Sequence, residues 1–274
     1  MGDMEPTRRV DVSRSEAAGV HAAQDAVVVE EPLEIRTGKT SVVVIMRTPG
    51  HDEELAAGFL VTENVIRRCG DVEEIFHCDE PGAQQTSGNV LVVKLADTAS
   101  VDLERLRRNF YATSSCGLCG KASIDSVRQY APPIEGRPVV DRAVLCDLPR
   151  RMRAAQHVFA ATGGLHAAGL FDATGRLLCL REDVGRHNAV DKVVGWAVLE
   201  DRLPLRETIL LVSGRASFEI VQKALVAGVP VVGAVSAATS LAVDLARESN
   251  MTLMGFIRDE RFVVYAGPDI PAGP

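Results

Sequence analysis

The sequence predicts an α/β protein with two parts, a small α+β unit followed by a three-layer α/β/α domain. The second half of the chain alternates short β-branched apolar runs with helical patterns, which is typical of a sheet covered by helices on both faces. A stretch rich in proline, residues 131–138, separates this half from the first. The length of 274 residues suits one large domain or two ordinary ones.

The first unit, residues 26–112, is predicted to follow a polar, flexible tail over residues 1–25. Two apolar runs on either side of a Thr-Gly-Lys turn predict a pair of strands. Asp52 is the predicted N-cap of a helix with one apolar face. The predicted elements are strands at residues 26–36, 41–46 and 90–95, a helix that begins near Asp52, and a short helix at residues 103–110.

Residues 113–138 are predicted to form a loop and linker, and residues 139–267 to form the larger domain. Its clearest helix follows Asn188, where apolar residues recur at helical spacing. Gly228 is the predicted end of another helix. The predicted elements are strands at residues 165–171, 177–181, 208–212, 229–235, 251–257 and 262–266 and helices at residues 147–161, 190–198, 218–227 and 240–248.

The composition argues against several classes of protein. A net charge of −7 is unlike that of a general nucleic-acid binder, which usually has a basic face. Residues 1–25 lack the apolar region of a signal peptide. The most apolar tract, residues 229–243, is interrupted by glycine and hydroxyl residues, so it does not predict a membrane span. We therefore expect a cytoplasmic protein whose six cysteines are reduced thiols.

The motif Ser114-Ser115-Cys116-Gly117-Leu118-Cys119-Gly120-Lys121 places two thiols in the connection between the two parts. Half of a zinc site, a dithiol redox centre, a sulfur carrier and an inert pair all fit this spacing. A zinc site lacks a second pair of ligands at suitable spacing, and a thioredoxin-like centre is expected in a βαβ unit near the start of a domain. Flanking glycines and a neighbouring lysine, which favours a thiolate, suit a carrier. Spacing alone leaves redox and persulfide chemistry both open.

Several strand ends of the larger domain could bind an anion. Ser213-Gly214-Arg215 follows an apolar strand and opens a helix, which offers backbone N–H groups and a guanidinium to a phosphate. His166 and His187 each lie in a glycine-rich turn beside a strand end. Neither a Walker A motif nor a GxGxxG motif is present. A charged segment near the C-terminus is either a solvated turn between two strands or a segment that binds an anion. It consists of Phe256, Ile257, Arg258, Asp259, Glu260 and Arg261.

Taken together, an ordered set of sequence blocks resembles the formate dehydrogenase accessory sulfurtransferases, the FdhD family. The most specific block reads Arg-Glu-Asp-Val-Gly-Arg-His-Asn-Ala-Val-Asp-Lys over residues 181–192. The CxxC motif is another, and the resemblance leaves out only the N-terminal tail. The remaining blocks are residues 29–33, 46–60, 162–170, 213–215 and 251–256.

This resemblance implies a sulfurtransferase that carries sulfur as a persulfide. Cys116 maps to the persulfide cysteine, and Cys119 is the second thiol of the loop. The implied donor is a cysteine desulfurase. The implied acceptor is the molybdenum cofactor, in its bis-molybdopterin guanine dinucleotide form, before its insertion into formate dehydrogenase. The family also implies a homodimer, a cytidine-deaminase-like larger domain, no permanent metal, and a cofactor-binding segment that maps to Phe256, Ile257, Arg258, Asp259, Glu260 and Arg261.

The implied fold raises deamination as a rival function. A zinc deaminase needs a His/Cys-x-Glu motif followed by Pro-Cys-x-x-Cys. Here Ser115 precedes Cys116, and no suitable His-x-Glu lies upstream, so the sequence argues against deamination. A cofactor-binding chaperone without sulfur transfer and a CxxC dithiol oxidoreductase both stay open as rival functions.

Overall fold

The computed structural model describes residues 5–17, 19–78, 88–97, 131–258, 260–268 and 270. Its N-terminal elements are β1 (Thr7–Glu16), β2 (Gly19–Val28), β3 (Glu31–Thr37), β4 (Thr40–Arg47), α1 (Asp52–Thr62), the short 3₁₀ turn η1 (Cys69–Asp71), β5 (Val72–His77) and β6 (Val90–Leu95). The elements after the linker are α3 (Arg142–Ala155), α4 (His157–Thr162), β7 (His166–Asp172), β8 (Leu177–Asp183), α5 (Arg186–Leu199), β9 (Thr208–Val212), α6 (Phe218–Val226), β10 (Val231–Ala234), α7 (Ser240–Glu248), β11 (Thr252–Arg258) and β12 (Arg261–Ala266).

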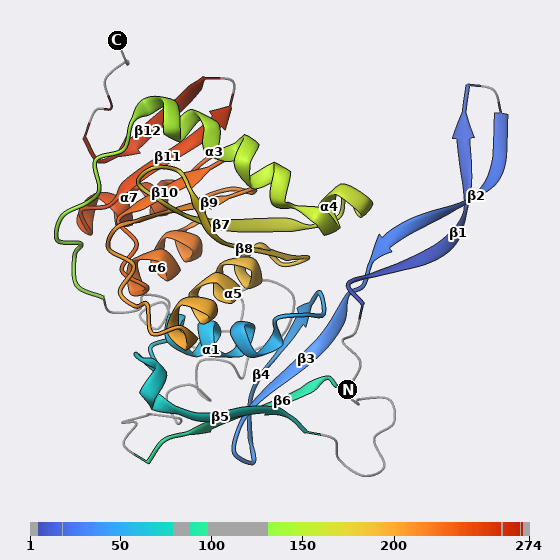
Figure 1. The fold of residues 1–274 in the computed structure, drawn as a ribbon, viewed down its shortest axis with the longest axis horizontal. Coiled ribbons are helices and arrows are strands. Elements are labelled where there is room, and N and C mark those ends of the chain that lie inside the picture. Colours follow the sequence, from blue (N-terminus) through green and yellow to red (C-terminus); the bar gives the residue numbers. More distant parts are fainter. Residues whose placement is uncertain are drawn as a thin grey trace.

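A six-stranded sheet forms the middle layer of the larger part, in the order β12-β11-β10-β9-β7-β8. Strands β9, β10 and β11 are parallel, whereas β7 and β12 run antiparallel to their neighbours. Figure 1 shows α3 on one side of this sheet and α5, α6 and α7 on the other. The arrangement confirms the predicted α/β class with helices on both faces of a sheet.

Alternation along the strands explains the three layers, because successive side chains of a strand point to opposite faces. Ile209 and Leu211 of β9 pack in a cluster with Leu148 and Met152 of α3. Leu210, between them, belongs to the cluster formed with α5, α6 and α7. Both clusters are made of side chains with little or no exposed surface, so each face of the sheet is buried by helices.

The first part contains a four-stranded sheet in the order β4-β3-β6-β5, with α1 packed between it and α5 (Figure 1). Leu33 of β3, Leu55 of α1 and Val190 of α5 all belong to one buried cluster. A continuous core therefore joins the small sheet to the larger domain. The division at residues 26–112, 113–138 and 139–267 stays a prediction, since residues 98–130 lie outside the described part.

The expectation of a loose tail over residues 1–25 is wrong for the residues that form β1 and β2. These strands pair in antiparallel register from Thr7↔Val28 to Glu16↔Gly19, and Figure 1 shows the hairpin extending from the body. Its side chains are mostly exposed, so this stretch has too little apolar alternation from which to predict strands. Backbone hydrogen bonds across the ladder, rather than burial, define the hairpin.

Two further differences concern the first helix predicted for the larger domain and the sheet of the first part. The helix predicted at residues 147–161 is two helices, because α3 begins at Arg142, where Asp141 accepts a hydrogen bond from the Ala143 backbone N–H, and ends before Gln156. The sequence does not predict strand β5, because its two consecutive exposed glutamates interrupt the apolar alternation expected of a strand.

Among the described residues, no helix combines the length and the apolar character needed to cross a bilayer.

Candidate functional site

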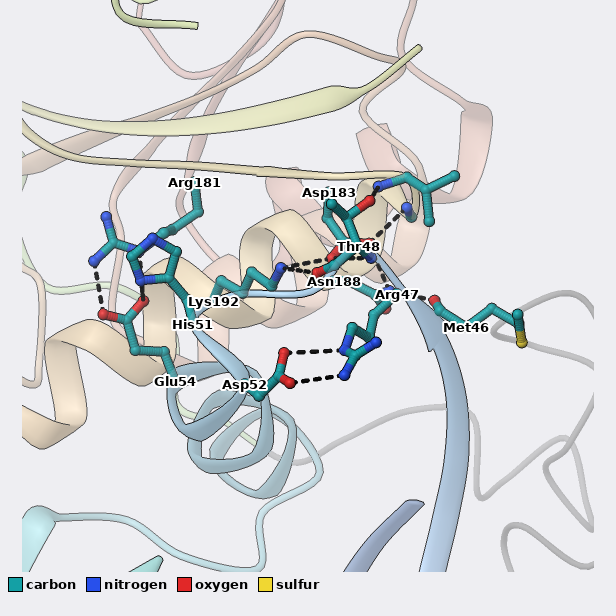
Figure 2. A network of polar contacts seen from close by, with 12 residues as sticks. Met46, Arg47, Thr48, His51, Asp52, Glu54, Arg181, Asp183, Asn188 and Lys192 are labelled. Carbon is teal, nitrogen blue, oxygen red and sulfur yellow. Dashed lines mark hydrogen bonds and ion pairs between the residues drawn. The ribbon is translucent and has the colours of Figure 1, made fainter. Parts of the chain in front are cut away.

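Two sequence blocks far apart in the chain meet at the centre of the molecule. The turn between β4 and α1 contacts the turn between β8 and α5, and Figure 2 shows the polar side chains that join them. Asp183 at the end of β8 has no exposed surface and lies at the centre of this network. We call the contacts of Asp183 with Thr48, Asn188 and Lys192 the clasp.

Each oxygen of the Asp183 carboxylate has two partners. One oxygen accepts from the backbone N–H of Gly185 (2.8 Å) and from the side-chain amide of Asn188 (2.8 Å). The other accepts from the backbone N–H of Thr48 (3.2 Å) and pairs with the Lys192 ammonium at 2.7 Å. Lys192, whose side chain is 1% exposed, also donates to the Thr48 carbonyl (2.9 Å). The buried charges are thus paired and hydrogen-bonded, as burial away from solvent requires.

Arg47 and Asp52 extend the network into the first part (Figure 2). Arg47 Nε lies 3.0 Å from one Asp52 oxygen, and its Nη2 lies 2.9 Å from the other, so the pair is bidentate and buried. Asp52 is therefore not the N-cap that the sequence predicted. It is the first residue of α1, and His51, with a left-handed φ of 57°, occupies the cap position. The Asp52 carboxylate accepts hydrogen bonds from Arg47 instead, and this ion pair anchors the start of the helix.

A second ion pair ties α1 to β8. The guanidinium of Arg181 donates to both oxygens of Glu54, and His51 lies 3.5 Å from the same carboxylate. Burial raises the pKa of Glu54, but hydrogen bonds from Arg181 and His51 outweigh it and hold that pKa below its ordinary value. Glu54 is therefore ionised at neutral pH and contributes to the attachment of α1.

Helices α1 and α5 cross at two glycines. A Cβ atom at Gly58 would lie 1.8 Å from the carbonyl oxygen of Asp191, and one at Gly195 would lie 1.7 Å from that of Glu54. Neither distance is possible, so only glycine permits this approach of the two backbones.

A buried ion pair lies close to this crossing, where Lys223 of α6 contacts both carboxylate oxygens of Asp191 at 2.8 Å. Burial lowers the pKa of Lys223, but the Asp191 carboxylate and neighbouring acidic groups outweigh it and raise that pKa.

The ends of several strands form one continuous edge of the six-stranded sheet, which we call the strand-end edge. It comprises the ends of β8, β9, β10 and β11 and the start of β7, which runs the opposite way. Backbone hydrogen bonds join its turns: Ser236 N–H donates to Gly214, and Phe256 N–H donates to Ser236. The predicted strand-end residues therefore lie side by side at the position where open α/β sheets bind ligands.

Three helices begin at this edge. The residues that precede α5, α6 and α7 are Gly185, Ser217 and Thr239, and none of them caps its helix with a side-chain hydrogen bond. By contrast, Asp141 caps α3. Helix N-termini carry partial positive charge and N–H groups that suit anions. The edge therefore offers positive potential from its backbone.

Arginine side chains add full charges to the same edge. Arg215, Arg258 and Arg261 are exposed, and Arg186 is partly buried. Among the described residues, none of these four forms an ion pair with a carboxylate, whereas Arg47 and Arg181 do. Unneutralised guanidinium groups beside helix N-termini fit a ligand with several phosphate charges.

The segment Phe256–Arg261 differs along its length. Phe256 is exposed with a left-handed φ of 51°, and Arg258 lies 6.0 Å from its ring. The Ile257 side chain is fully buried in the cluster with α3, so only its backbone can face a ligand. The carbonyl of Glu260 accepts from Arg142. Asp259 lies outside the described residues.

The two histidines that the sequence singled out both lie at the strand-end edge. His187 Nε2 is 2.9 Å from a carboxylate oxygen of Glu219, and the Ser217 hydroxyl is 3.5 Å from the same nitrogen. His166 is half-buried at the start of β7. Burial, Arg186 and His187 lower the pKa of His166 below its ordinary value.

The predicted thiols Cys116 and Cys119 lie outside the described residues. The four described cysteines, Cys69, Cys78, Cys146 and Cys179, are free thiols. Burial raises the pKa of Cys179 to about 12 and raises that of Cys146. Such thiols stay protonated and are poor nucleophiles at neutral pH. Among the described residues, no group of histidine, cysteine or acidic side chains could hold a metal ion.

A scan against known protein families matches residues 28–270 to the model of the FdhD/NarQ family. The chain belongs to the FdhD/NarQ family. It is 52% identical to the sulfur carrier protein FdhD of Mycolicibacterium paratuberculosis over 97% of this chain and 99% of that protein. It is also 52% identical to the sulfur carrier protein FdhD of Nocardia farcinica, over 95% of this chain and 93% of the relative. The family prediction is confirmed.

A solved structure shows the same fold. A protein from Desulfotalea psychrophila, described as a formate dehydrogenase accessory protein, superposes with a TM-score of 0.74 over 97% of this chain and 99% of that one. At 24% sequence identity this likeness concerns the fold alone. The solved structure thus supports the α/β fold described above.

The sequence missed the clasp. Asp183, Asn188 and Lys192 lie in the block that the resemblance rested on, yet they face the β4–α1 turn. A signal was present: Asp191 and Lys192 interrupt an apolar helix, and charged residues at such positions are rarely buried unless they are paired.

Proposed function

We propose that this FdhD-family protein is a sulfur carrier for the molybdenum cofactor of formate dehydrogenase. Cys116 takes sulfur from the persulfide of a cysteine desulfurase. It passes that sulfur to the cofactor, in its bis-molybdopterin guanine dinucleotide form, before insertion. The observation that carries the proposal is the strand-end edge, where three helix N-termini converge with arginines that have no carboxylate partner among the described residues. The names of the full-length relatives support the sulfur-carrying role.

The first step is a thiol exchange. The Cys116 thiolate attacks the outer sulfur of the donor persulfide, the sulfur–sulfur bond of the donor breaks, and the donor thiolate leaves. Lys121 and the glycines around the motif favour a reactive, accessible thiolate. The described thiols with shifted pKa values are shifted upward, which makes them unsuited to this step.

The second step delivers the sulfur. Releasing it as sulfide takes two electrons, which Cys119 supplies when its thiolate attacks Cys116 and forms a disulfide. A cellular thiol reductant then restores both thiols. In this scheme the strand-end edge binds the cofactor's phosphates, and Arg215, Arg258 and Arg261 offset their charge. This explains how a chain with a net charge of −7 binds a polyanion.

The sulfur-transfer step is tested by intact-protein mass spectrometry. The reduced chain is incubated with a cysteine desulfurase and cysteine, and we expect a gain of one sulfur. Cys116→Ala should abolish the gain, whereas Cys69→Ala, which removes a described free thiol, should retain it. Cofactor binding without any sulfur gain would favour a chaperone instead. A Cys116–Cys119 disulfide that cycles with reductant, again without sulfur gain, would favour a dithiol oxidoreductase.

Binding at the segment is tested with guanosine diphosphate as the probe. The double variant Arg258→Ala/Arg261→Ala should weaken binding about tenfold or more, as expected from the loss of charge-assisted hydrogen bonds. Arg176→Ala, which removes an arginine paired with Asp172, is the matched control. Unchanged affinity in the double variant would remove the segment from the site.

The proposed partners are the cysteine desulfurase and formate dehydrogenase, and the proposed location is the cytoplasm. A homodimer is also proposed, and light scattering coupled to size-exclusion chromatography measures it directly. A monomer at micromolar concentration would refute the dimer without affecting the sulfur-transfer proposal.

A further inference from the structure

Two polar groups at the strand-end edge lack partners within the described chain. The Nε atom of Arg186, at the start of α5, is buried and without a hydrogen-bond partner. The ring of His166, at the start of β7, is half-buried, and no hydrogen bond or ion pair joins it to a described residue. An unsatisfied buried polar group costs free energy, so a ligand atom between these groups would be stabilising.

Gly214 lies against both groups. A Cβ atom placed there would be 3.4 Å from His166 Nδ1 and 3.9 Å from Arg186 Cδ, which are ordinary contact distances. An alanine would therefore fit without a clash but would occupy the space beside the imidazole and the guanidinium. Gly214 lies in the connection between β9 and α6, and it places no side-chain atom against these two groups.

We propose that His166 and Arg186 form an oxyanion subsite beside Gly214, and that His166 takes up a proton when a phosphate group binds there. The proposal rests on the function proposed above in placing a phosphate-bearing ligand at this edge. It adds two residues outside the Phe256–Arg261 segment and a proton that His166 takes up from the solvent when the ligand binds.

The charges around His166 explain the proton uptake. Arg186 and His187 of α5 face the ring and oppose its protonation, and Asp183 of β8 favours it. Asp183 is already paired with Lys192, and Glu219 of α6 is paired with His187. With burial, the opposing charges lower the pKa of His166. A bound oxyanion offsets the charge of Arg186, so the pKa rises and the imidazolium donates to the ligand.

The sign of the pH dependence follows. Protonated His166 binds an anion better than neutral His166, so lower pH favours binding relative to a variant that cannot titrate. His166→Gln keeps a polar side chain without the proton equilibrium. Because phosphate ligands also titrate, the informative quantity is the ratio of wild-type to variant affinity at each pH, in which the ligand's own titration cancels.

The experiment is isothermal titration calorimetry on the full chain with inorganic pyrophosphate and, separately, guanosine diphosphate, in buffers of different ionisation enthalpy. We expect net proton uptake in the wild type and a smaller uptake in His166→Gln. The affinity ratio should be near one at pH 8 and about tenfold at pH 6, the value of one charge-assisted hydrogen bond. Gly214→Ala should weaken binding at both pH values while its circular dichroism spectrum stays unchanged.

The control variant is His157→Gln, an exposed histidine at the start of α4, which should behave as the wild type. Uptake with both ligands assigns the subsite to any phosphate oxyanion, and uptake with the nucleotide alone assigns it to a nucleotide diphosphate. The same proton uptake in His166→Gln, or no binding of either ligand to the wild type, overturns the proposal. Sulfur gain on Cys116 is measured on the same preparations, and its absence with intact binding refutes sulfur transfer while leaving the subsite.

Discussion

The clasp gives a quantitative prediction about stability. Removing one partner of a buried ion pair costs about 3–5 kcal/mol, because the other charge is left buried without compensation. In Lys192→Met, Asp183 keeps three N–H donors, from Thr48, Gly185 and Asn188. In Asp183→Leu, the Lys192 ammonium keeps the Thr48 carbonyl, a neutral acceptor, in place of its counter-charge. We therefore expect a loss of about 3 kcal/mol for Lys192→Met and about 5 kcal/mol for Asp183→Leu.

Urea unfolding followed by circular dichroism at pH 7 measures both losses, with the slope of the transition compared between variants. Lys94→Met is the matched control, because Lys94 and Glu73 form an ion pair in which each side chain is 53% exposed. The control should shift the midpoint little, since exposed pairs contribute little. If Asp183→Leu does not fold, Asp183→Asn preserves the shape and still leaves the ammonium without its counter-charge. A Lys192→Met midpoint equal to that of the control would refute the reasoning.

Three other predictions concern Gly195 of α5, Glu54 of α1 and the buried thiol of Cys179. Gly195→Ala should destabilise the fold by about 3 kcal/mol or more, because its Cβ would overlap the Glu54 carbonyl, whereas Gly70→Ala meets nothing within 4 Å; equal urea midpoints would contradict the helix crossing. Because the pKa of Glu54 is lowered in the folded state, its charge stabilises the protein above the ordinary value of 4.5 and ceases to do so as pH falls through the folded value. The stability difference between wild type and Glu54→Gln should therefore shrink below pH 4.5, and a pH-independent difference would count against the ion pair. Cys179, with a pKa of about 12 against an ordinary 9.0, should react with iodoacetamide roughly a thousandfold more slowly in the native than in the unfolded chain, as peptide mapping can measure.

The sequence located the elements of the larger domain well where burial governs them. The strand Thr208–Val212 and the helix Ser240–Glu248 have the bounds that the pattern predicted. The strand is buried along its whole length, and the helix has one apolar and one polar face, so each shows a clear pattern of apolar residues in the sequence. The β1–β2 hairpin leaves none, because its side chains are mostly exposed and its stability comes from backbone pairing.

The candidate site was predictable in its residue types and less so in its arrangement. Glycine and arginine after an apolar strand predict an anion site at Ser213-Gly214-Arg215, which stays a prediction, and the structure places the turns of Ser236 and Phe256 beside it. The partners of Asp183 could not be foreseen, because Thr48 lies 135 residues away and no local pattern encodes such a contact. The roles of Cys116 and Cys119 stay predictions, since both lie outside the described residues.

The block over residues 181–192 serves two purposes, and the clasp connects them. Asp183, Asn188 and Lys192 point inward and fix the start of α5 against the β4–α1 turn. Arg186 and His187 lie between them in sequence and belong to the strand-end edge. The buried clasp fixes the start of α5, which keeps Arg186 near Gly214, with no carboxylate partner among the described residues. The anion site proposed above requires charges held in place before the ligand arrives, and a helix start fixed by buried contacts meets that requirement.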